Sequence, residues 1–138
     1  MALAENSAER KWVSLKHEAS PVATSEAALA RLHGIRVLVI DENKFARSLL
    51  RNALQVLGIW RVTECMNVKD VLVCLAEEAI DLVLIENQMS NGSGVDFTKA
   101  VRRSETVRNQ AVPIIMVSNQ TDIFEIREAI DSGIHDFL

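Results

Sequence analysis

The chain has 138 residues, of which 49% are hydrophobic and 25% are charged, and its formal net charge is -4. This length fits one domain with a real hydrophobic core, and the acidic balance argues against a broad electrostatic surface for nucleic acid. No apolar run approaches the roughly 20 residues of a membrane helix, and no basic segment followed by an apolar core opens the chain, so we expect a cytoplasmic protein that binds neither membrane nor nucleic acid.

Residues 1–34 are predicted to form an N-terminal extension that is partly helical or flexible. A weak helical stripe over residues 8–19 includes Trp12 and Leu15. A second short helix is predicted over residues 25–33, with its first serine as the N-cap.

Residues 35–138 alternate between short apolar runs and segments with helical spacing. The runs predict five strands, at residues 35–40, 60–65, 82–85, 114–117 and 136–138. Four helices are predicted between them, and Gly58 and Gly133 lie where the first and fourth would end. The apolar positions that mark these helices are Phe45, Leu49, Ala53, Val56 and Leu57 in the first, Val68, Val71, Leu72 and Leu75 in the second, Val95, Phe97, Ala100 and Val101 in the third, and Ile123, Ile126, Ala129 and Ile130 in the fourth.

Strands that are apolar throughout are buried on both faces, and alternating strands and helices give a parallel sheet with helices on each side. We therefore expect an α/β fold with a doubly wound, five-stranded parallel sheet. The chain stops inside the fifth strand, so the final helix is missing and one face of the sheet lacks cover. The N-terminal helical pieces, a second copy in a homodimer, or residues beyond Leu138 are the expected covers.

Polar side chains end three of the predicted strands. Asp41 and Glu42 follow the first, Glu86 follows the third and Ser118 follows the fourth. Singly, each has a structural explanation, since Asp41 or Asn43 could cap a helix, Glu86 could be a solvated loop acid, and Ser118 could satisfy a local backbone group. Together they mark the carboxyl ends of the strands, where open α/β sheets bind ligands, and they predict a cation or phosphoryl site.

Several ordered motifs carry a family resemblance. Residues 39–42 form an acidic pair after an apolar strand, residues 81–85 lead to Glu86, and residues 113–118 end in a hydroxyl. With these motifs, residues 35–138 resemble the receiver domains of bacterial two-component response regulators. The remaining matching positions are Arg47, Leu50 and Leu54 in the first helix, Met89 and Gly94 after Glu86, and Ala129, Gly133 and Phe137 near the end.

The resemblance implies a flavodoxin-like sheet with strand order 2-1-3-4-5. It also implies that Mg²⁺ is held by Asp41, Glu42, Glu86 and the backbone carbonyl of Gln88, which are hard oxygen ligands. Glu86 occupies the phosphoacceptor position. Ser118 and Phe137 occupy the switch positions, and their movement would remodel the face made by the fourth helix and fifth strand. The implied partner is a sensor kinase or another signalling protein.

Three features depart from the family pattern. Glu86 replaces an aspartate, which moves the nucleophilic oxygen outward by roughly 1.5 Å, and a misplacement of about 1 Å costs about a hundredfold in rate. The family's lysine after the switch aromatic would lie beyond Leu138. Ser90 replaces a proline and is expected to loosen the flexible turn that is predicted over residues 87–94. Asn119 is expected to crowd the entrance to the site. Bound Mg²⁺ is therefore expected to be weakened or absent.

The preferred interpretation is a receiver module that acts by protein–protein interaction, independently of phosphorylation, and is not an enzyme. One alternative is a conventional Mg²⁺-dependent phosphoacceptor receiver in a phosphomimetic or truncated form. Another is a small Mg²⁺-dependent phosphohydrolase, although no histidine lies near the motifs and no Gly-rich phosphate loop is present. The sequence also suggests that Cys65 and Cys74 are reduced packing residues and that Arg102, Arg103 and Arg108 belong to a solvated surface.

Overall fold

A computed structural model of the protein describes residues 26–118 and 122–138. Its main sheet has five parallel strands in the order β2-β1-β3-β6-β7. Numbered along this sheet alone, that order is 2-1-3-4-5, so the predicted topology is confirmed. The strands are β1 (Arg36–Ile40), β2 (Arg61–Cys65), β3 (Leu82–Ile85), β6 (Ile114–Met116) and β7 (Asp136–Phe137).

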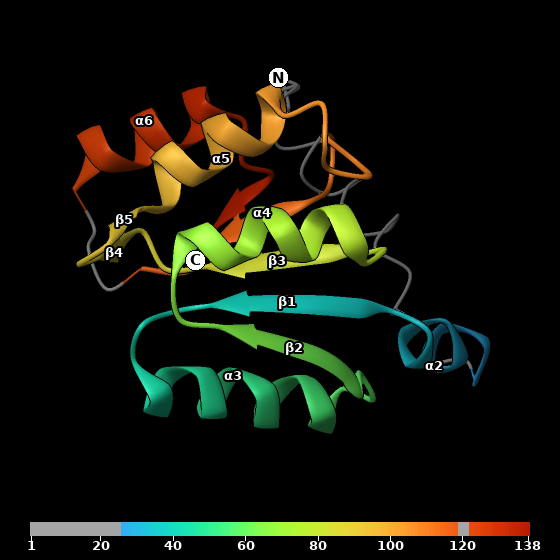
Figure 1. Ribbon diagram of the computed structural model, residues 1–138. Helices are drawn as coiled ribbons and strands as arrows, with labels where there is room; N and C mark the ends of the chain where they lie inside the picture. The colour runs from blue at the N-terminus through green and yellow to red at the C-terminus, as the bar shows by residue number, and fades with distance from the viewer. Residues whose placement is uncertain (1–25, 119–121) are drawn as a thin grey trace, which may run out of the picture.

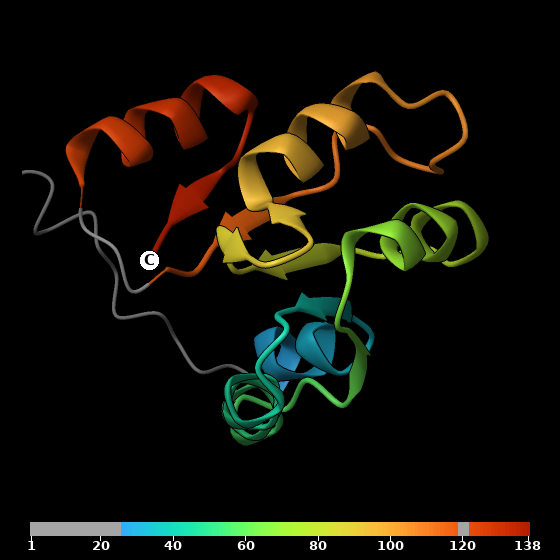
Figure 2. The ribbon, with the colours of Figure 1, turned by 60° about the vertical axis from the view of Figure 1, so that its left-hand side comes forward.

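Helices cover both sides of this sheet. Helices α4, α5 and α6 lie on one side and α3 lies on the other, as both ribbon views show (Figures 1 and 2). The short helix α2 lies beside the end where β1 begins (Figure 1). The helices are α2 (Glu26–His33), α3 (Lys44–Val56), α4 (Val68–Glu77), α5 (Gly94–Arg103) and α6 (Ile123–Ser132). None of these helices is both long and apolar enough to cross a membrane.

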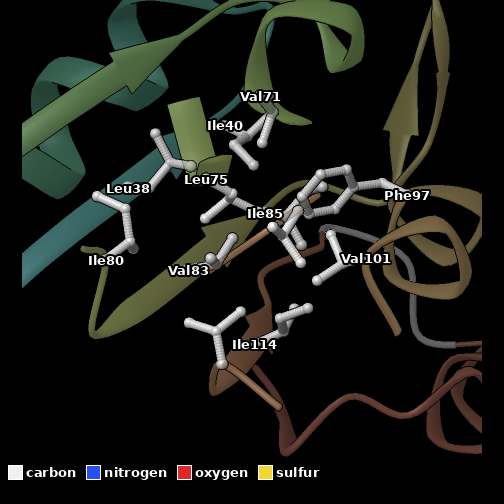
Figure 3. Packing of buried hydrophobic residues seen from close by; sticks show 12 residues of the cluster. Leu38, Ile40, Val71, Leu75, Ile80, Val83, Ile85, Phe97, Val101 and Ile114 are labelled. Atoms are coloured by element: carbon white, nitrogen blue, oxygen red, sulfur yellow. The ribbon is translucent and has the colours of Figure 1, made fainter. Parts of the chain in front are cut away.

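The larger core cluster lies between the sheet and helices α4 and α5 (Figure 3). Because side chains alternate along a strand, Leu38 and Ile40 of β1 face this cluster. Phe97 and Val101 of α5 pack into the same cluster. All four side chains are almost completely buried. The predicted inward face of α5 is therefore confirmed, and burial of Val71 confirms that of α4.

The smaller core cluster lies on the α3 side and corrects the predicted orientation of that helix. Val37 and Val39 of β1 pack here with Leu54 of α3. The predicted apolar stripe faces outward instead, with Phe45 76% exposed and Val56 87% exposed. Helix α3 carries apolar residues on two faces, so spacing alone could not choose between them. The partly buried side chains that complete this cluster include Leu32 of α2 and Leu50 of α3.

Strand β2 also differs from its prediction as a run buried on both faces. It lies at one edge of the sheet, and its residues are half-buried or exposed. The strand contains polar as well as apolar residues, with Arg61 and Glu64 among the polar ones. Trp60, which comes directly before this strand, is 63% exposed. An edge strand has one neighbour only, which explains this mixed composition.

The segment after β3 is more ordered than the predicted flexible turn. Strands β4 (Gln88–Met89) and β5 (Gly92–Ser93) pair antiparallel to form a small hairpin. Ser93 then caps α5, because its hydroxyl accepts a hydrogen bond from the Asp96 amide at 3.0 Å. The hairpin therefore gives the loop beside Glu86 a defined path into α5.

Three parts of the sequence interpretation lie outside the described residues. These are the N-terminal stripe with Trp12 and Leu15, the serine predicted to cap the second short helix, and the expected crowding by Asn119. The short helix predicted over residues 25–33 corresponds to α2.

Candidate functional site

A polar cleft lies at the carboxyl ends of the central strands. It has a volume of about 390 Å³. The structure brings five of the six predicted site residues to it. The lining residues are Asp41, Glu42, Asn43, Ala46, Glu86, Gln88 and Ser118.

The loop from β1 to α3 is fixed by hydrogen bonds at both ends. Asp41 is buried, and its Oδ1 accepts a hydrogen bond from the Asn43 amide at 2.8 Å. Asn43 is the N-cap of α3, as one of the structural explanations proposed. Buried Arg47 reaches back from α3 and donates to the carbonyls of Asp41 at 2.7 Å and Glu42 at 3.2 Å. The sequence placed Arg47 in the helix pattern without indicating this contact. The contact fixes the backbone position of both acidic residues.

Glu86 is half-buried at the end of β3, and its carboxylate is bound by its own loop. Glu86 Oε1 accepts a hydrogen bond from the Gln88 amide at 3.0 Å. The next residue, Asn87, is buried, and its side-chain oxygen accepts from the Val95 amide at 3.2 Å. These contacts join Glu86 to the start of α5.

Gly94 is the point at which α5 approaches this loop most closely. A Cβ atom at Gly94 would lie 2.9 Å from the Glu86 carbonyl oxygen and 3.1 Å from Asn87 Cα. Both neighbours are backbone, which cannot move aside as a flexible side chain can.

We therefore expect Gly94→Ala to lower the free energy of unfolding by about 1–3 kcal/mol, the usual cost of overpacking. Urea denaturation of the purified protein measures this change. Gly34→Ala is the matched control, since the nearest atom to a Cβ there is 3.8 Å away. Equal losses in the two variants would contradict the close approach at Gly94.

Glu42 and Ser90 bind one another across the mouth of the cleft. Glu42 Oε2 accepts from the Ser90 amide at 2.9 Å and from the Ser90 hydroxyl at 2.5 Å. These two hydrogen bonds lower the pKa of the Glu42 carboxyl, and the bond from the hydroxyl has the larger effect. The expectation that Ser90 loosens the loop is wrong, because a serine supplies two donors where a proline has none.

The predicted metal ligands have the right chemistry but do not converge. Carboxylate and carbonyl oxygens suit Mg²⁺, yet each acid directs an oxygen to an amide of its own or a facing loop. Within residues 26–118 and 122–138, no group of three or more histidine, cysteine or acidic side chains is placed to hold a metal ion. The acidic side chains would have to reorient to hold a divalent cation together.

The two switch positions lie in different surroundings. Ser118 lines the cleft, and its amide donates to the Leu138 carbonyl at 3.1 Å. Phe137 does not line the cleft, because it packs partly buried against Val95, Met116 and Ala129. The structure thus separates the predicted switch aromatic from the other five site residues.

A contact that the sequence did not indicate leads from the cleft to α6. The side-chain amide of Gln88 donates to Glu125 Oε1 at 3.3 Å. Glu125 belongs to the first turn of α6. The backbone amide of Gln88 also donates to Glu86 Oε1, so one residue contacts both Glu86 and α6.

Arg102 corrects the interpretation of the arginine cluster as a solvated surface. Its guanidinium donates to the carbonyls of Gln110 at 2.6 Å, Val112 at 2.9 Å and Gly133 at 2.9 and 3.1 Å. Burial lowers the pKa of Arg102. Arg102 is therefore a structural residue that joins α5, the following loop and the end of α6.

The two cysteines agree with their interpretation as packing residues. Both are free thiols, half-buried, and in contact with the larger core cluster. Burial is the main reason that the pKa of Cys74 rises to about 11 and that the pKa of Cys65 also rises. Few thiolates form near neutral pH under these conditions.

A second hollow, of about 600 Å³, lies between α2 and the end of α3. Most of its lining side chains are apolar, such as Leu29, Leu32 and Val56. It offers no cluster of oxygen ligands, so the polar cleft remains the candidate site.

Comparisons with known proteins give a consistent family. Chemotaxis protein CheY of Pseudomonas aeruginosa is 24% identical over 75% of this chain and 82% of its own length. Histidine kinase CKI1 of Arabidopsis thaliana is 29% identical over 78% of this chain, and the chain spans 11% of the kinase's length. Sensor protein GacS of Pseudomonas syringae is 32% identical, and the match again covers 11% of that protein.

Solved structures with sequence identities in the same range have a similar fold. A response regulator receiver protein from Pseudomonas putida is 30% identical with a TM-score of 0.67, over 75% of this chain and 84% of that one. The receiver domain of CKI1 in complex with Mg²⁺ and BeF₃⁻ is 29% identical, also with a TM-score of 0.67, over 80% and 83% of the two chains. The family model for the response regulator receiver domain matches residues 37–138, which include every predicted site residue, and the chain therefore belongs to the response regulator receiver domain family.

Proposed function

We propose that this receiver domain acts in two-component signal transduction by binding a partner protein, and that it does not accept a phosphoryl group. The observation that carries the proposal is the presence of a glutamate, Glu86, where the family has an aspartate. Its carboxylate stands at the acceptor position, and one of its oxygens is already bound by the Gln88 amide at 3.0 Å.

The chemistry of phosphoryl transfer supports this proposal. Transfer depends almost entirely on positioning and on neutralising charge. The extra methylene of Glu86 moves the attacking oxygen by roughly 1.5 Å, and a misplacement of about 1 Å costs about a hundredfold in rate. The three acids also fail to converge as a metal site within the described residues, so we propose that Mg²⁺ binds weakly at Asp41, Glu42, Glu86 and the Gln88 carbonyl.

The proposed partner-binding face is made by α6 and β7. Ile123, Phe124 and Ile130 of α6 are 68%, 78% and 59% exposed. Clustered exposed apolar side chains mark interaction surfaces. The contact between Gln88 and Glu125 joins this face to the acceptor position, and Ser118 and Phe137 complete the proposed switch. A sensor kinase or another signalling protein is the proposed partner.

We also propose that residues 1–34 form an extension to a receiver body of residues 35–138. Within this extension, α2 is in contact with the body, because Leu32 packs partly buried against the smaller core cluster. The same side of the sheet is the proposed surface for a homodimer. Sedimentation velocity of the full chain distinguishes a monomer from a dimer.

The proposal predicts an unchanged mass after incubation with a small phosphodonor and Mg²⁺. Intact-mass spectrometry of the full 138-residue chain makes this measurement, and the same treatment without Mg²⁺ is the control. A stable, Mg²⁺-dependent gain of one phosphoryl group would sink the proposal in favour of a conventional phosphoacceptor receiver.

A further inference from the structure

The contact between Glu42 and Ser90 joins two loops that are far apart in the sequence. Glu42 belongs to the loop between β1 and α3, and Ser90 belongs to the tip of the β4–β5 hairpin, 48 positions later. Both donors of Ser90 bind the same oxygen, Glu42 Oε2. A divalent cation held by the acids of the cleft would join these same two loops.

The two hydrogen bonds compete directly with metal binding. A carboxylate oxygen that ligates Mg²⁺ has to lie about 2.0–2.1 Å from the ion in a nearly octahedral arrangement. A cation that is ligated by Glu42 Oε2 competes for this oxygen with both hydrogen bonds from Ser90. Hydrogen bonds to an ionised acceptor are roughly twice as strong as those between neutral groups.

Charge repulsion favours the same outward position of Glu42. Asp41, Glu42 and Glu86 line one cleft, and like charges brought close together destabilise one another. In the absence of a cation, Glu42 lowers this repulsion when it lies toward Ser90. The hydrogen bonds and the repulsion therefore act in one direction.

We propose that Ser90 is a positioning residue that withdraws Glu42 from the cleft and clasps the two loops without a cation. The clasp lowers the affinity of the cleft for Mg²⁺. This inference deepens the proposed function, on which it rests for the identity of the cleft. It concerns metal binding alone and does not require Glu86 to be inert toward phosphodonors.

The test is a titration of the full-length, ¹⁵N-labelled protein with MgCl₂ in the absence of any phosphodonor, followed at the Asn43 and Gln88 amides. Ser90→Ala removes the hydroxyl and keeps the amide donor, whereas Ser90→Pro removes both. Loss of one and then two hydrogen bonds to an ionised acceptor is expected to tighten Mg²⁺ binding by about tenfold and about a hundredfold. Asn91→Ala is the matched control, since Asn91 lies in the same turn and its side chain binds the Met66 carbonyl; its affinity is expected to equal that of the parent protein.

Equal affinities in the parent protein and both Ser90 variants, or weaker binding by Ser90→Ala, would overturn the inference. A second measurement keeps it testable where the proline disturbs the hairpin. In EDTA, the Ser90 amide is expected to exchange its hydrogen more slowly in the parent protein than in Glu42→Ala, and equal rates would also overturn the clasp. Intact mass stays the separate readout for phosphoryl acceptance, so either proposal can fail without the other.

Discussion

Arg102→Ala is expected to lower the free energy of unfolding by about 3 kcal/mol. A hydrogen bond that involves a charged group contributes about 1.5–3 kcal/mol, and Arg102 binds three backbone carbonyls at 2.6–3.1 Å. The contributions do not add fully, because burying the guanidinium has its own cost. Folded domains have total stabilities of about 5–15 kcal/mol, so this one side chain accounts for a large share.

Arg103→Ala is the matched control for Arg102→Ala. The two arginines are neighbours on α5, but Arg103 is exposed to solvent. Surface substitutions of this kind change stability by less than about 0.5 kcal/mol. Urea denaturation followed by circular dichroism compares the two variants. Similar stabilities would contradict the structural role assigned to Arg102 and restore its interpretation as a solvated residue.

Glu86→Asp is expected to take up a phosphoryl group at least about a hundredfold faster than the parent protein, whose mass is expected to stay unchanged, given Mg²⁺ and a small phosphodonor. The shorter side chain returns the attacking oxygen to the position that the family uses. The shorter side chain also weakens the hydrogen bond from the Gln88 backbone amide, which Glu86 Oε1 accepts at 3.0 Å. The measurement is the rate of mass gain in the intact protein.

Glu86→Gln is the control for that substitution, because it has the length of glutamate and no nucleophilic carboxylate. It is expected to take up no phosphoryl group. Uptake by Glu86→Asp that does not exceed the uptake by Glu86→Gln would show that side-chain length is not the obstacle. Equally fast uptake by the parent protein and Glu86→Asp would instead support the conventional phosphoacceptor receiver.

The sequence was sufficient for the sheet and for the helices that pack against its larger core. Long apolar stretches such as β3 have one stable location, buried between neighbours, so their position follows from composition. Helix α3 was harder, because it carries apolar residues on two faces. Leu54 is buried while Phe45 is 76% exposed, and only tertiary packing decides between such faces.

The sequence was also sufficient to locate the cleft, because the carboxyl ends of parallel strands meet at one edge of a sheet. It could not predict how the polar side chains pair across that cleft. Ser90 and Glu42 are 48 positions apart, and Gln88 and Glu125 are 37 positions apart. Such contacts depend on the exact path of the β4–β5 hairpin, which the sequence presented as a flexible turn.

The prediction that Arg102 is solvated was wrong for a related reason. A cluster of arginines on an acidic domain is usually solvated, and nothing in the local pattern separates Arg102 from Arg103. The difference arises because the loop after α5 and the turn at Gly133 bring carbonyl groups to one side of the helix. The role of Arg102 therefore follows from the tertiary fold and not from the spacing of residues along α5.

The proposed partner-binding face of α6 and β7 is expected to form without a phosphoryl group at Glu86. Nuclear magnetic resonance of the ¹⁵N-labelled protein with Mg²⁺ and beryllofluoride, a combination found in the structure of the CKI1 receiver domain, measures whether a phosphoryl analogue changes this face. Relative to Mg²⁺ alone, we expect no further shift of the Ser118, Phe137 and α6 amides. Saturable shifts of these amides on addition of beryllofluoride would show that the face responds to a phosphoryl group.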